Sequence, residues 1–378
     1  MTDRIRDYLA ANPAQNGPVL VLDLEQVRDN YTNFAKALPD TRVFYAVKAN
    51  PAPEVLQLLA DLGSCFDAAS VAEIEMVLAT GADASRVSFG NTIKKERDVA
   101  RAYELGIRLF AVDCEQEVDK IARVAPGSKV FCRILCDCVG AEWPLSRKFG
   151  CAPDMAVDVL EHAHRLGLIA HGLSFHVGSQ QRDTGSWDRA LAQAAQVFRD
   201  CAERGINLAM VNMGGGFPTK YLKKVPAVKA YGSAIFTALR KHFGNQIPET
   251  IIEPGRGMVG NAGIIQTEVV LISKKSKAED ETRWVYLDIG KFGGLAETMD
   301  ESIRYSIKSK RDGGKKTPCV LAGPTCDSVD VMYEKAPYDL PVSLEIGDKL
   351  LIEGTGAYTT TYSAVAFNGF DPLRQIVI

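Results

Sequence analysis

Short apolar runs alternate with amphipathic stretches from residue 42 to about residue 263. The runs are rich in β-branched and aromatic residues and have the length of buried strands, whereas the stretches between them carry apolar residues at helical spacing. We expect eight strands, over Val43–Ala49, Cys65–Ala68, Arg86–Gly90, Arg108–Val112, Lys129–Leu135, Leu168–Val177, Leu208–Met213 and Thr250–Glu253. Helices are expected between them, for example over Glu54–Leu62, Val71–Thr80, Lys95–Leu105 and Met155–Leu166.

This alternation predicts an α/β fold. Strands separated by helices pair in parallel, and eight such units close into a (β/α)8 barrel of about 250 residues. The apolar run from Pro18 and the amphipathic segment Leu24–Leu38 predict a strand and a helix ahead of the barrel strands. We place the barrel at residues 25–263, with an open, doubly wound sheet as the alternative.

Beyond Gly263 the pattern changes to β-type segments separated by glycine, proline and charge clusters, which predicts a mostly antiparallel β domain over 264–378. The expected strands are Ile264–Ile272, Arg283–Asp288, Cys319–Ala322, Asp348–Glu353 and Ala364–Phe367. The lysine-rich runs Lys274–Lys277 and Lys308–Lys316 are interpreted as solvated loops.

Composition narrows the function classes. The 378 residues carry a net charge of −3, which argues against a nucleic-acid partner because phosphate neutralisation needs a basic surface. The N-terminus lacks the apolar core of a signal peptide, and no apolar run approaches the roughly 18 residues of a membrane span. We therefore expect a cytoplasmic protein without a membrane partner.

The nine cysteines form an odd number without the spacing of a disulfide framework, as is typical of reduced thiols. Cys132, Cys136 and Cys138 share parity on a strand, but no histidine or second Cys-x-x-Cys lies nearby to complete a zinc site. Small apolar packing is the favoured interpretation, and no metal is expected.

Barrel enzymes carry their chemistry where strands end and the following loops begin. Chemically distinctive residues fall at these places: Lys48 after the first strand, Asp67 after the second, Arg133 on the fifth, His176 after the sixth, Gly214–Gly216 after the seventh and Glu253 after the eighth. The expected site therefore lies at the C-terminal ends of the barrel strands.

Lys48 lies two residues before its predicted strand breaks at Asn50-Pro51. In a buried position, low dielectric disfavours the ammonium and makes the neutral amine, a nucleophile toward carbonyls, accessible. The alternative is an ordinary strand-end lysine whose stem covers apolar surface while its head reaches water.

The three consecutive glycines Gly214–Gly216 expose backbone N–H groups in the manner of a phosphate cradle, and Arg256 adds a bidentate donor. The imidazole of His176 is flat enough to stack on an aromatic cofactor, with the Ser179 hydroxyl as a phosphate donor. Each feature alone is more often structural. Together with Lys48 and a carboxylate at Glu253, which would keep a pyridine nitrogen protonated, they are the parts that hold pyridoxal phosphate (PLP).

Six motifs in order resemble those of the fold-type III PLP-dependent decarboxylases, and most closely their ornithine decarboxylase group. They are Tyr45–Asn50, His176–Ser179, Gly214–Phe217, Glu253–Arg256, Gly323–Asp327 and Gly356–Thr359. The resemblance spans about 18–370. It implies an alanine-racemase-like barrel, a C-terminal β domain joined by residues 1–24, and a homodimer with shared active sites. It also implies decarboxylation of L-ornithine to putrescine, with L-lysine to cadaverine as a further reaction.

The resemblance also implies residue roles. Lys48 would be the Schiff-base lysine, His176 the ring-stacking residue and Glu253 the partner of the pyridine nitrogen. The cofactor and its phosphate would further be held by Ser179, Gly215, Gly216, Gly255, Arg256 and Tyr358, with Asp67 and Arg133 in support. Cys326 and Asp327 would reach the neighbouring subunit's site, the thiol to protonate Cα and the carboxylate to bind the distal amine.

One departure concerns the second acid that binds the distal amine in eukaryotic ornithine decarboxylases. It stands directly before a glycine, whereas here Ile289 precedes Gly290 and Asp288 lies one place earlier. On a strand this shift reverses the side-chain face, so the contact would come through water or from Glu297 or Asp300.

Three alternatives remain open. Diaminopimelate decarboxylases share the fold but typically carry Cys-Glu-Ser where this chain has Cys326-Asp327-Ser328, and the shorter acid suits a simple diamine. A non-catalytic binding regulator would have lost the PLP residues, all of which are present. A single-domain PLP carrier would end after the barrel.

Overall fold

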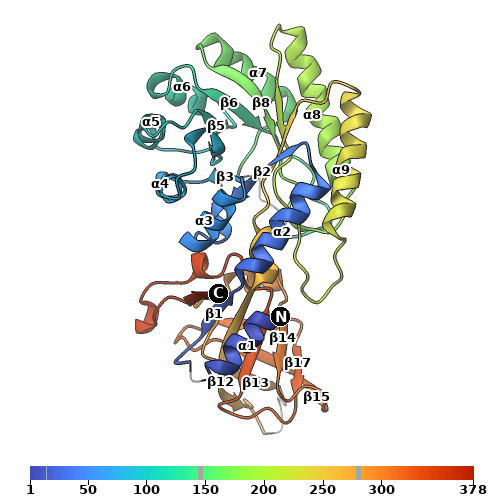
Figure 1. The fold of residues 1–378 in the computed structure, drawn as a ribbon. Helices are drawn as coiled ribbons and strands as arrows, with labels where there is room; N and C mark the ends of the chain where they lie inside the picture. The colour runs from blue at the N-terminus through green and yellow to red at the C-terminus, as the bar shows by residue number, and fades with distance from the viewer. Residues whose placement is uncertain (14, 144–147, 278–281) are drawn as a thin grey trace. The chain divides into compact units, whose positions relative to one another are not determined.

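The computed structural model describes residues 1–13, 15–143, 148–277 and 282–378. It contains two compact units (Figure 1). The barrel unit consists of Arg28–Pro218 and Val225–Met258. The β unit consists of Met1–Val27, Thr219–Lys224 and Val259–Ile378.

In the described part of the barrel unit, eight parallel strands close into a barrel in the order β10-β11-β2-β3-β4-β5-β6-β8. They are β2 (Thr41–Ala46), β3 (Cys65–Ala68), β4 (Val87–Phe89), β5 (Leu109–Val112), β6 (Lys129–Arg133), β8 (Ile169–Ser174), β10 (Met210–Asn212) and β11 (Glu249–Ile252). The (β/α)8 barrel is thus confirmed, and the closed hydrogen-bonding order excludes an open sheet. Phe44, Phe131 and Met210 belong to its buried core.

Helices follow the barrel strands (Figure 1). These segments are helical because their apolar residues recur at helical spacing on one face. In α7 (Pro153–Arg165) the buried Ala156, Val159, Leu160 and Ala163 follow the i, i+3, i+4, i+7 pattern. The other long helices of this unit are α3 (Pro53–Asp61), α4 (Val71–Leu78), α5 (Glu96–Glu104), α6 (Glu115–Val124), α8 (Ser186–Glu203) and α9 (Val228–Phe243), and α2 (Leu24–Ala37) precedes β2. A two-stranded antiparallel sheet of β7 (Ala141–Trp143) and β9 (Ser179–Gln181) was not expected.

The β unit is a mostly antiparallel sheet, as expected, with the order β14-β18-β12-β13-β15-β16. Its strands are β1 (Val19–Leu22), β12 (Gly263–Ser273), β13 (Arg283–Leu287), β14 (Ser306–Ser309), β15 (Lys316–Ala322), β16 (Val331–Met332), β17 (Tyr338–Pro341), β18 (Lys349–Glu353) and β19 (Arg374–Val377). Strand β1 pairs with β12 and with β19, so the N-terminal segment, which begins with α1 (Asp3–Ala11), joins this unit.

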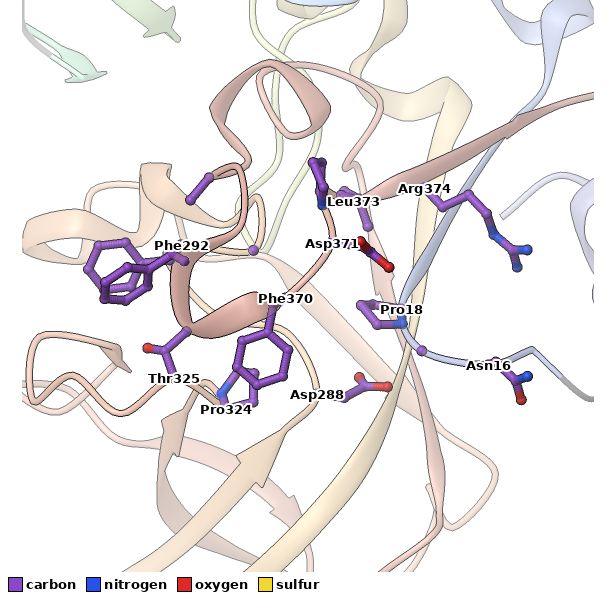
Figure 2. Close-up of a pocket in the computed structure, with 15 residues that line it drawn as sticks. Asn16, Pro18, Asp288, Phe292, Pro324, Thr325, Phe370, Asp371, Leu373 and Arg374 are labelled. Carbon is purple, nitrogen blue, oxygen red and sulfur yellow. The ribbon is translucent and has the colours of Figure 1, made fainter.

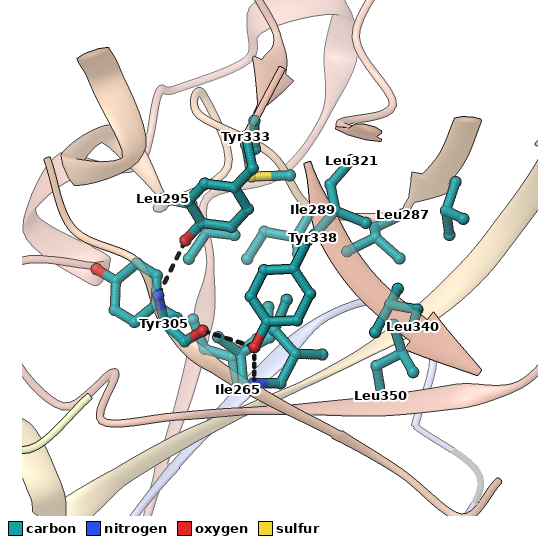
Figure 3. Packing of buried hydrophobic residues seen from close by; sticks show 14 of the residues in the cluster. Ile265, Leu287, Ile289, Leu295, Tyr305, Leu321, Tyr333, Tyr338, Leu340 and Leu350 are labelled. Carbon is teal, nitrogen blue, oxygen red and sulfur yellow. Dashed lines mark hydrogen bonds between the residues drawn. The ribbon is translucent and has the colours of Figure 1, made fainter. Parts of the chain in front are cut away.

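Two buried tyrosines tie the core of the β unit to its backbone (Figure 3). The Tyr338 hydroxyl donates to the Tyr305 carbonyl at 3.0 Å and accepts the Ile307 N–H at 2.9 Å. The Tyr333 hydroxyl accepts the Tyr305 N–H at 3.0 Å. Because burial raises the pKa of both phenols, they stay neutral donors over the physiological range.

Three expected strand assignments are wrong in detail. Ala364–Phe367 is not a strand, because Ala366 adopts a left-handed φ of +59° that no strand accommodates, and 3-10 turn η6 (Phe367–Gly369) follows. The first barrel strand ends at Ala46, and Lys48 lies in the 3-10 turn η1 (Val47–Ala49). The sixth ends at Ser174, which places His176 in a loop.

Candidate active site

The glycine loop that follows β10 packs too closely for side chains. A Cβ at Gly215 would lie 2.7 Å from the Glu253 carbonyl oxygen. Gly216 has a φ of +101°, and a Cβ there would lie 2.6 Å from the Gly178 carbonyl oxygen. Glycine is therefore required at both positions, and the backbone of the loop lies directly against the segments after β8 and β11.

Two anion-binding side chains meet beside these segments. The Arg256 side chain is buried, at 3% exposure, and its Nε and Nη2 atoms donate to the Ser179 hydroxyl at 3.4 and 3.2 Å. Arg256 begins the short helix α10 (Arg256–Val259), and the carbonyl of the preceding Gly255 accepts the Met258 N–H at 2.9 Å. A guanidinium and a hydroxyl are both groups that bind an anionic ligand such as a phosphate.

The His176 ring is held neutral and in one tautomer. Its Nδ1 accepts the Gly178 N–H at 3.0 Å, so a neutral ring carries its proton on Nε2. Burial, followed by the positive charges of Arg133 and Lys48, lowers the pKa of His176 to about 3. A Cβ at Gly215 would lie 3.2 Å from Nε2, which places this flat, uncharged ring against the glycine loop.

Lys48 forms an ion pair with Asp67, with Nζ 3.2 Å from Oδ2. The Asp67 carboxylate is buried and accepts the Ser88 hydroxyl at 3.4 Å. A Cβ at Gly90 would lie 1.8 Å from Asp67 Oδ1, so a glycine there makes room for this carboxylate. The Lys48 side chain itself is half exposed, because it lies in the turn η1 rather than in the strand, which agrees with the alternative of a lysine whose head reaches water.

Glu253 follows β11 and faces the same group of residues. Its carboxylate accepts a hydrogen bond from the Asn212 amide, and its backbone N–H donates to the Gly214 carbonyl at 2.8 Å. Burial and the nearby Asp67 charge raise the pKa of Glu253 to about 7, although Lys48, the Asn212 donor and Arg133 all favour the anion. This carboxyl group is thus poised between its two protonation states at neutral pH.

The sequence-predicted residues divide between the two units. The barrel unit carries the glycine loop and the side chains of Lys48, Asp67, His176, Ser179, Glu253 and Arg256. It also carries Arg133, the last residue of β6, whose guanidinium lies 5.4 Å from the centre of the Phe149 ring. The β unit carries Asp288, Cys326, Asp327 and Tyr358. Sequence reasoning missed Asn212, the last residue of β10, and Ser88, the middle residue of β4, and the strand-end position of Asn212 is the one signal that could have pointed to it.

Within the β unit, Asp288 and Asp327 already have partners. Asp288 accepts the Thr267 hydroxyl and, at 2.9 Å, the Glu268 N–H. Asp327 caps its own turn by accepting the Val329 N–H at 2.8 Å. The backbone N–H of the exposed Cys326 donates to the Asn368 side chain at 2.7 Å, so the loop that carries Cys326 and Asp327 is anchored at two points.

A cavity of about 390 Å³ lies beside this loop in the β unit (Figure 2). Its lining includes aromatic rings and acids, among them Asp288, Phe292, Phe370 and Asp371, and also Pro324. In Figure 2, Asp288 and Asp371 lie on one side of the cavity, and Phe292 and Thr325 on the other. Tyr358 has a left-handed φ of +56°, and its ring lies 6.0 Å from that of Tyr362.

The residues of the barrel unit fit pyridoxal phosphate. The glycine loop offers a cradle that side chains would fill, the buried Arg256 and Ser179 supply phosphate donors, and neutral His176 supplies a flat stacking face. Lys48 adds an amine that can bond to the cofactor's aldehyde, and Glu253 adds a carboxyl group that can pair with its ring nitrogen. The fold and the site together place the chain in the class of PLP-dependent barrel enzymes.

A family model described as the pyridoxal binding domain of pyridoxal-dependent decarboxylases matches residues 24–260. The chain therefore belongs to the pyridoxal-dependent decarboxylase family, and its cofactor is pyridoxal 5′-phosphate. In the described ranges, no three metal-ligating side chains are grouped to hold a metal ion. No helix in the same ranges has the length and apolarity needed to cross a membrane.

Two similar proteins indicate where in the family the chain lies. It is 38% identical over 358 residues to the lysine/ornithine decarboxylase of Selenomonas ruminantium, covering 93% of this chain and 87% of that protein. It is 35% identical over 387 residues to the chloroplastic ornithine decarboxylase of Nicotiana glutinosa, covering 98% of this chain and 87% of that one. The expected resemblance to the ornithine decarboxylase group is thus confirmed.

Solved structures agree. That of the Selenomonas ruminantium enzyme SrLDC in complex with PLP and cadaverine matches with a TM-score of 0.88 at 35% identity, covering all of this chain and 94% of that one. The arginine decarboxylase of Paramecium bursaria Chlorella virus matches with a TM-score of 0.89 at 28% identity, with full coverage of both chains. The chain is therefore a PLP-dependent decarboxylase, similar to enzymes that are named for lysine, ornithine and arginine.

The raised pKa of Glu253 is expected to reduce stability at alkaline pH. The folded chain keeps this proton up to about pH 7, whereas an unfolded chain loses it near 4.5, so the stabilising effect is complete below pH 4.5 and is lost as the pH rises through 7. We expect Glu253→Gln, which stays neutral and keeps an acceptor for Asn212, to raise the unfolding free energy of the cofactor-free chain by roughly 1–3 kcal/mol at pH 8. Urea unfolding at pH 8 and pH 5 measures this, and equal gains at both values would contradict it.

Proposed function

We propose that this chain decarboxylates L-ornithine to putrescine and accepts L-lysine, giving cadaverine, as a second substrate. The observation that carries the proposal is the Glu253 carboxyl group, held beside the glycine loop and the Lys48–Asp67 pair. An acid facing the cofactor's ring nitrogen suits decarboxylation. The names of the Selenomonas and Nicotiana relatives support ornithine and lysine as the substrate class.

The residues take the following roles in this proposal. Lys48 holds the cofactor through its amine, and Asp67 keeps that amine positioned. Gly215, Gly216, Ser179, Gly255 and Arg256 hold the phosphate together with Tyr358, and His176 covers one face of the ring. Arg133 supports the site as a nearby positive charge. When bound, pyridoxal phosphate supplies the electron-withdrawing ring that accepts the electron pair left at Cα as carbon dioxide departs.

We further propose that the active unit is a homodimer. The loop at Cys326 is exposed although it is held rigidly, and so is the neighbouring apolar side chain of Val329, at 57% exposure. In the dimer this loop enters the partner's site, where the Cys326 thiol delivers a proton to Cα and Asp327 binds the distal ammonium of the substrate. Residues 25–263 would then form the cofactor-binding domain, and 264–378 with 1–24 the domain that completes the neighbouring site.

Discrimination between substrates depends on how the distal group is bound. Asp288 accepts hydrogen bonds from the Thr267 hydroxyl and the Glu268 N–H, whereas Asp327 accepts the Val329 N–H of its own turn and lies beside the exposed Cys326, so we propose Asp327 as the principal contact. One carboxylate that binds one ammonium tolerates side chains that differ by one methylene, a difference worth about 1–3 kcal/mol. We therefore propose that ornithine and lysine are both accepted, and that the longer and broader guanidinium of arginine is not.

The test is direct. Purified protein loaded with PLP is incubated with L-ornithine, L-lysine, L-arginine or meso-diaminopimelate, and the released amine is identified by mass spectrometry. We expect putrescine and cadaverine, with the larger kcat/KM for ornithine. Agmatine as the main product, or lysine formed from diaminopimelate, would overturn the proposed substrate class.

The reaction is proposed to take place in the cytoplasm. None of the nine cysteines forms a disulfide in the structure, which suits a reducing compartment. Cys132 and Cys151 lie with their sulfur atoms 3.5 Å apart and remain thiols.

A further inference from the structure

Asn212 lies between Glu253 and the glycine loop. It is the last residue of β10, and its side chain is buried at 1% exposure. Its Nδ2 donates to Glu253 Oε1, and its Oδ1 accepts the Gly214 N–H at 3.0 Å. One carboxamide therefore contacts both the proposed partner of the ring nitrogen and the start of the proposed phosphate loop.

The orientation of this carboxamide is fixed by its partners. The Gly214 N–H can only donate, so the amide oxygen must face it and the NH₂ group must face Glu253. A flipped amide would set its oxygen against the carboxylate and its NH₂ group against the N–H donor. In a buried site that leaves polar groups unsatisfied at about 1–3 kcal/mol each, so only one orientation is stable.

The backbone closes the same group of residues from the other side. The Glu253 N–H donates to the Gly214 carbonyl at 2.8 Å, so both polar backbone groups of Gly214 are bound within this group. Strands β10 and β11, which end just before these residues, pair in parallel with Asn212 opposite Ile251. Asn212, Gly214 and Glu253 therefore form a ring of three hydrogen bonds at the ends of adjacent barrel strands.

The charges around Glu253 explain why a donor is needed there. Burial and the Asp67 carboxylate favour a proton on Glu253, whereas the cations Lys48 and Arg133 favour its loss. His176 is uncharged. The Asn212 NH₂ group adds a hydrogen bond to the carboxylate oxygen, and an aspartate at position 212 would instead add a second negative charge.

We propose that Asn212 is a positioning residue that holds Glu253 as a carboxylate beside the glycine loop, so that Glu253 is able to accept a hydrogen bond from the cofactor's ring nitrogen and keep that nitrogen protonated. The proposal rests on the function proposed for Glu253 and names the residue that prepares it. Asn212 acts through Glu253 and does not itself contact the reacting atoms.

Asn212→Asp separates the two contacts of the carboxamide. The variant has nearly the same shape and keeps an acceptor for the Gly214 N–H, but it replaces the donor to Glu253 with an acceptor. Asn212→Ala removes both contacts. The control is Thr250→Val, which deletes a buried hydroxyl from the opposite end of β11, where it lies 2.8 Å from the Thr41 hydroxyl.

The primary measurement is a pH titration of the Glu253 carboxyl carbon by ¹³C NMR in the full, cofactor-free chain, assigned by its absence in Glu253→Gln. We expect Asn212→Ala to raise the proton affinity of Glu253 about tenfold, Asn212→Asp to raise it further, and Thr250→Val to leave it within twofold. A midpoint in Asn212→Asp equal to that of the wild type would overturn the proposal.

Steady-state kinetics of the PLP-saturated enzyme give the second readout. We expect kcat to fall at least tenfold in Asn212→Asp, with KM and the PLP dissociation constant within about threefold, because the Gly214 contact remains. If the midpoint moves and kcat does not, Asn212 is structural and the proposal fails. Full turnover in Glu253→Gln would instead overturn the function proposed for Glu253, while the NMR shift would still report the contact.

Discussion

Replacing Lys48 with alanine is expected to abolish turnover and to remove the absorption band near the visible edge that marks covalently held cofactor. Lys48 supplies the amine of the site, and Asp67 holds it at 3.2 Å from a buried carboxylate. Without that amine the cofactor is held only through its phosphate and ring contacts, and we expect kcat/KM to fall by at least about a thousandfold. Absorption spectra and amine release measure the two effects.

Lys48→Arg is the matched control. It keeps a positive charge for Asp67 but cannot form the same bond to an aldehyde, so the band should be lost while the stability of the folded chain is retained. A Lys48→Ala protein that still shows a band reducible by borohydride would mean that another amine holds the cofactor.

Mixing an inactive variant with a strongly weakened one is expected to raise amine release well above that of either variant alone. In the proposed dimer each site combines Lys48 of one subunit with Cys326 and Asp327 of the other. A heterodimer of Lys48→Ala with Cys326→Ala/Asp327→Ala therefore contains one wild-type site and one doubly damaged site. With random exchange, about half of the dimers carry one working site, which corresponds to roughly a quarter of wild-type activity.

Subunit exchange has to be shown independently, for example by energy transfer between labelled subunits. If the subunits exchange and no activity returns, the shared-site proposal is wrong. The single variants separate the two roles. Cys326→Ala should still release carbon dioxide but misplace a proton, whereas Asp327→Ala should mainly raise KM, by about 1.5–3 kcal/mol of lost binding.

The barrel could be predicted because each of its strands is a short apolar run that lies between amphipathic helices. Each strand can therefore be recognised from a short stretch of the sequence. The β unit was harder. Its strands β16 and β19 have 2 and 4 residues, and a short run carries little periodicity. Ala364–Phe367 has strand composition, but left-handed residues at Ala366 and Asn368 turn the chain there.

The site was predicted from residue types, and its finer structure depends on packing that no pattern encodes. The half-exposed Lys48 follows from a 3-10 turn three residues long. The need for glycine at Gly90 follows from the buried carboxylate of Asp67, which comes from the neighbouring strand. Asn212 was missed because a strand-end asparagine before a glycine loop suggests no particular role until its partner after the adjacent strand, Glu253, is known.

Strand β1 has a consequence for how the chain acquires its structure. It lies between β12 and β19, with Val19 opposite Gln266 on one side and Arg374 on the other. During synthesis, residues of β1 emerge long before either neighbour exists, whereas each barrel strand has at least one partner that is made soon before or after it, and β2 then waits for β11 to close the barrel. Contacts of such long sequence separation form slowly. The barrel is thus expected to fold first on the ribosome, with β1 left unpaired until the last strand is made, which makes this early segment a natural site for chaperone binding.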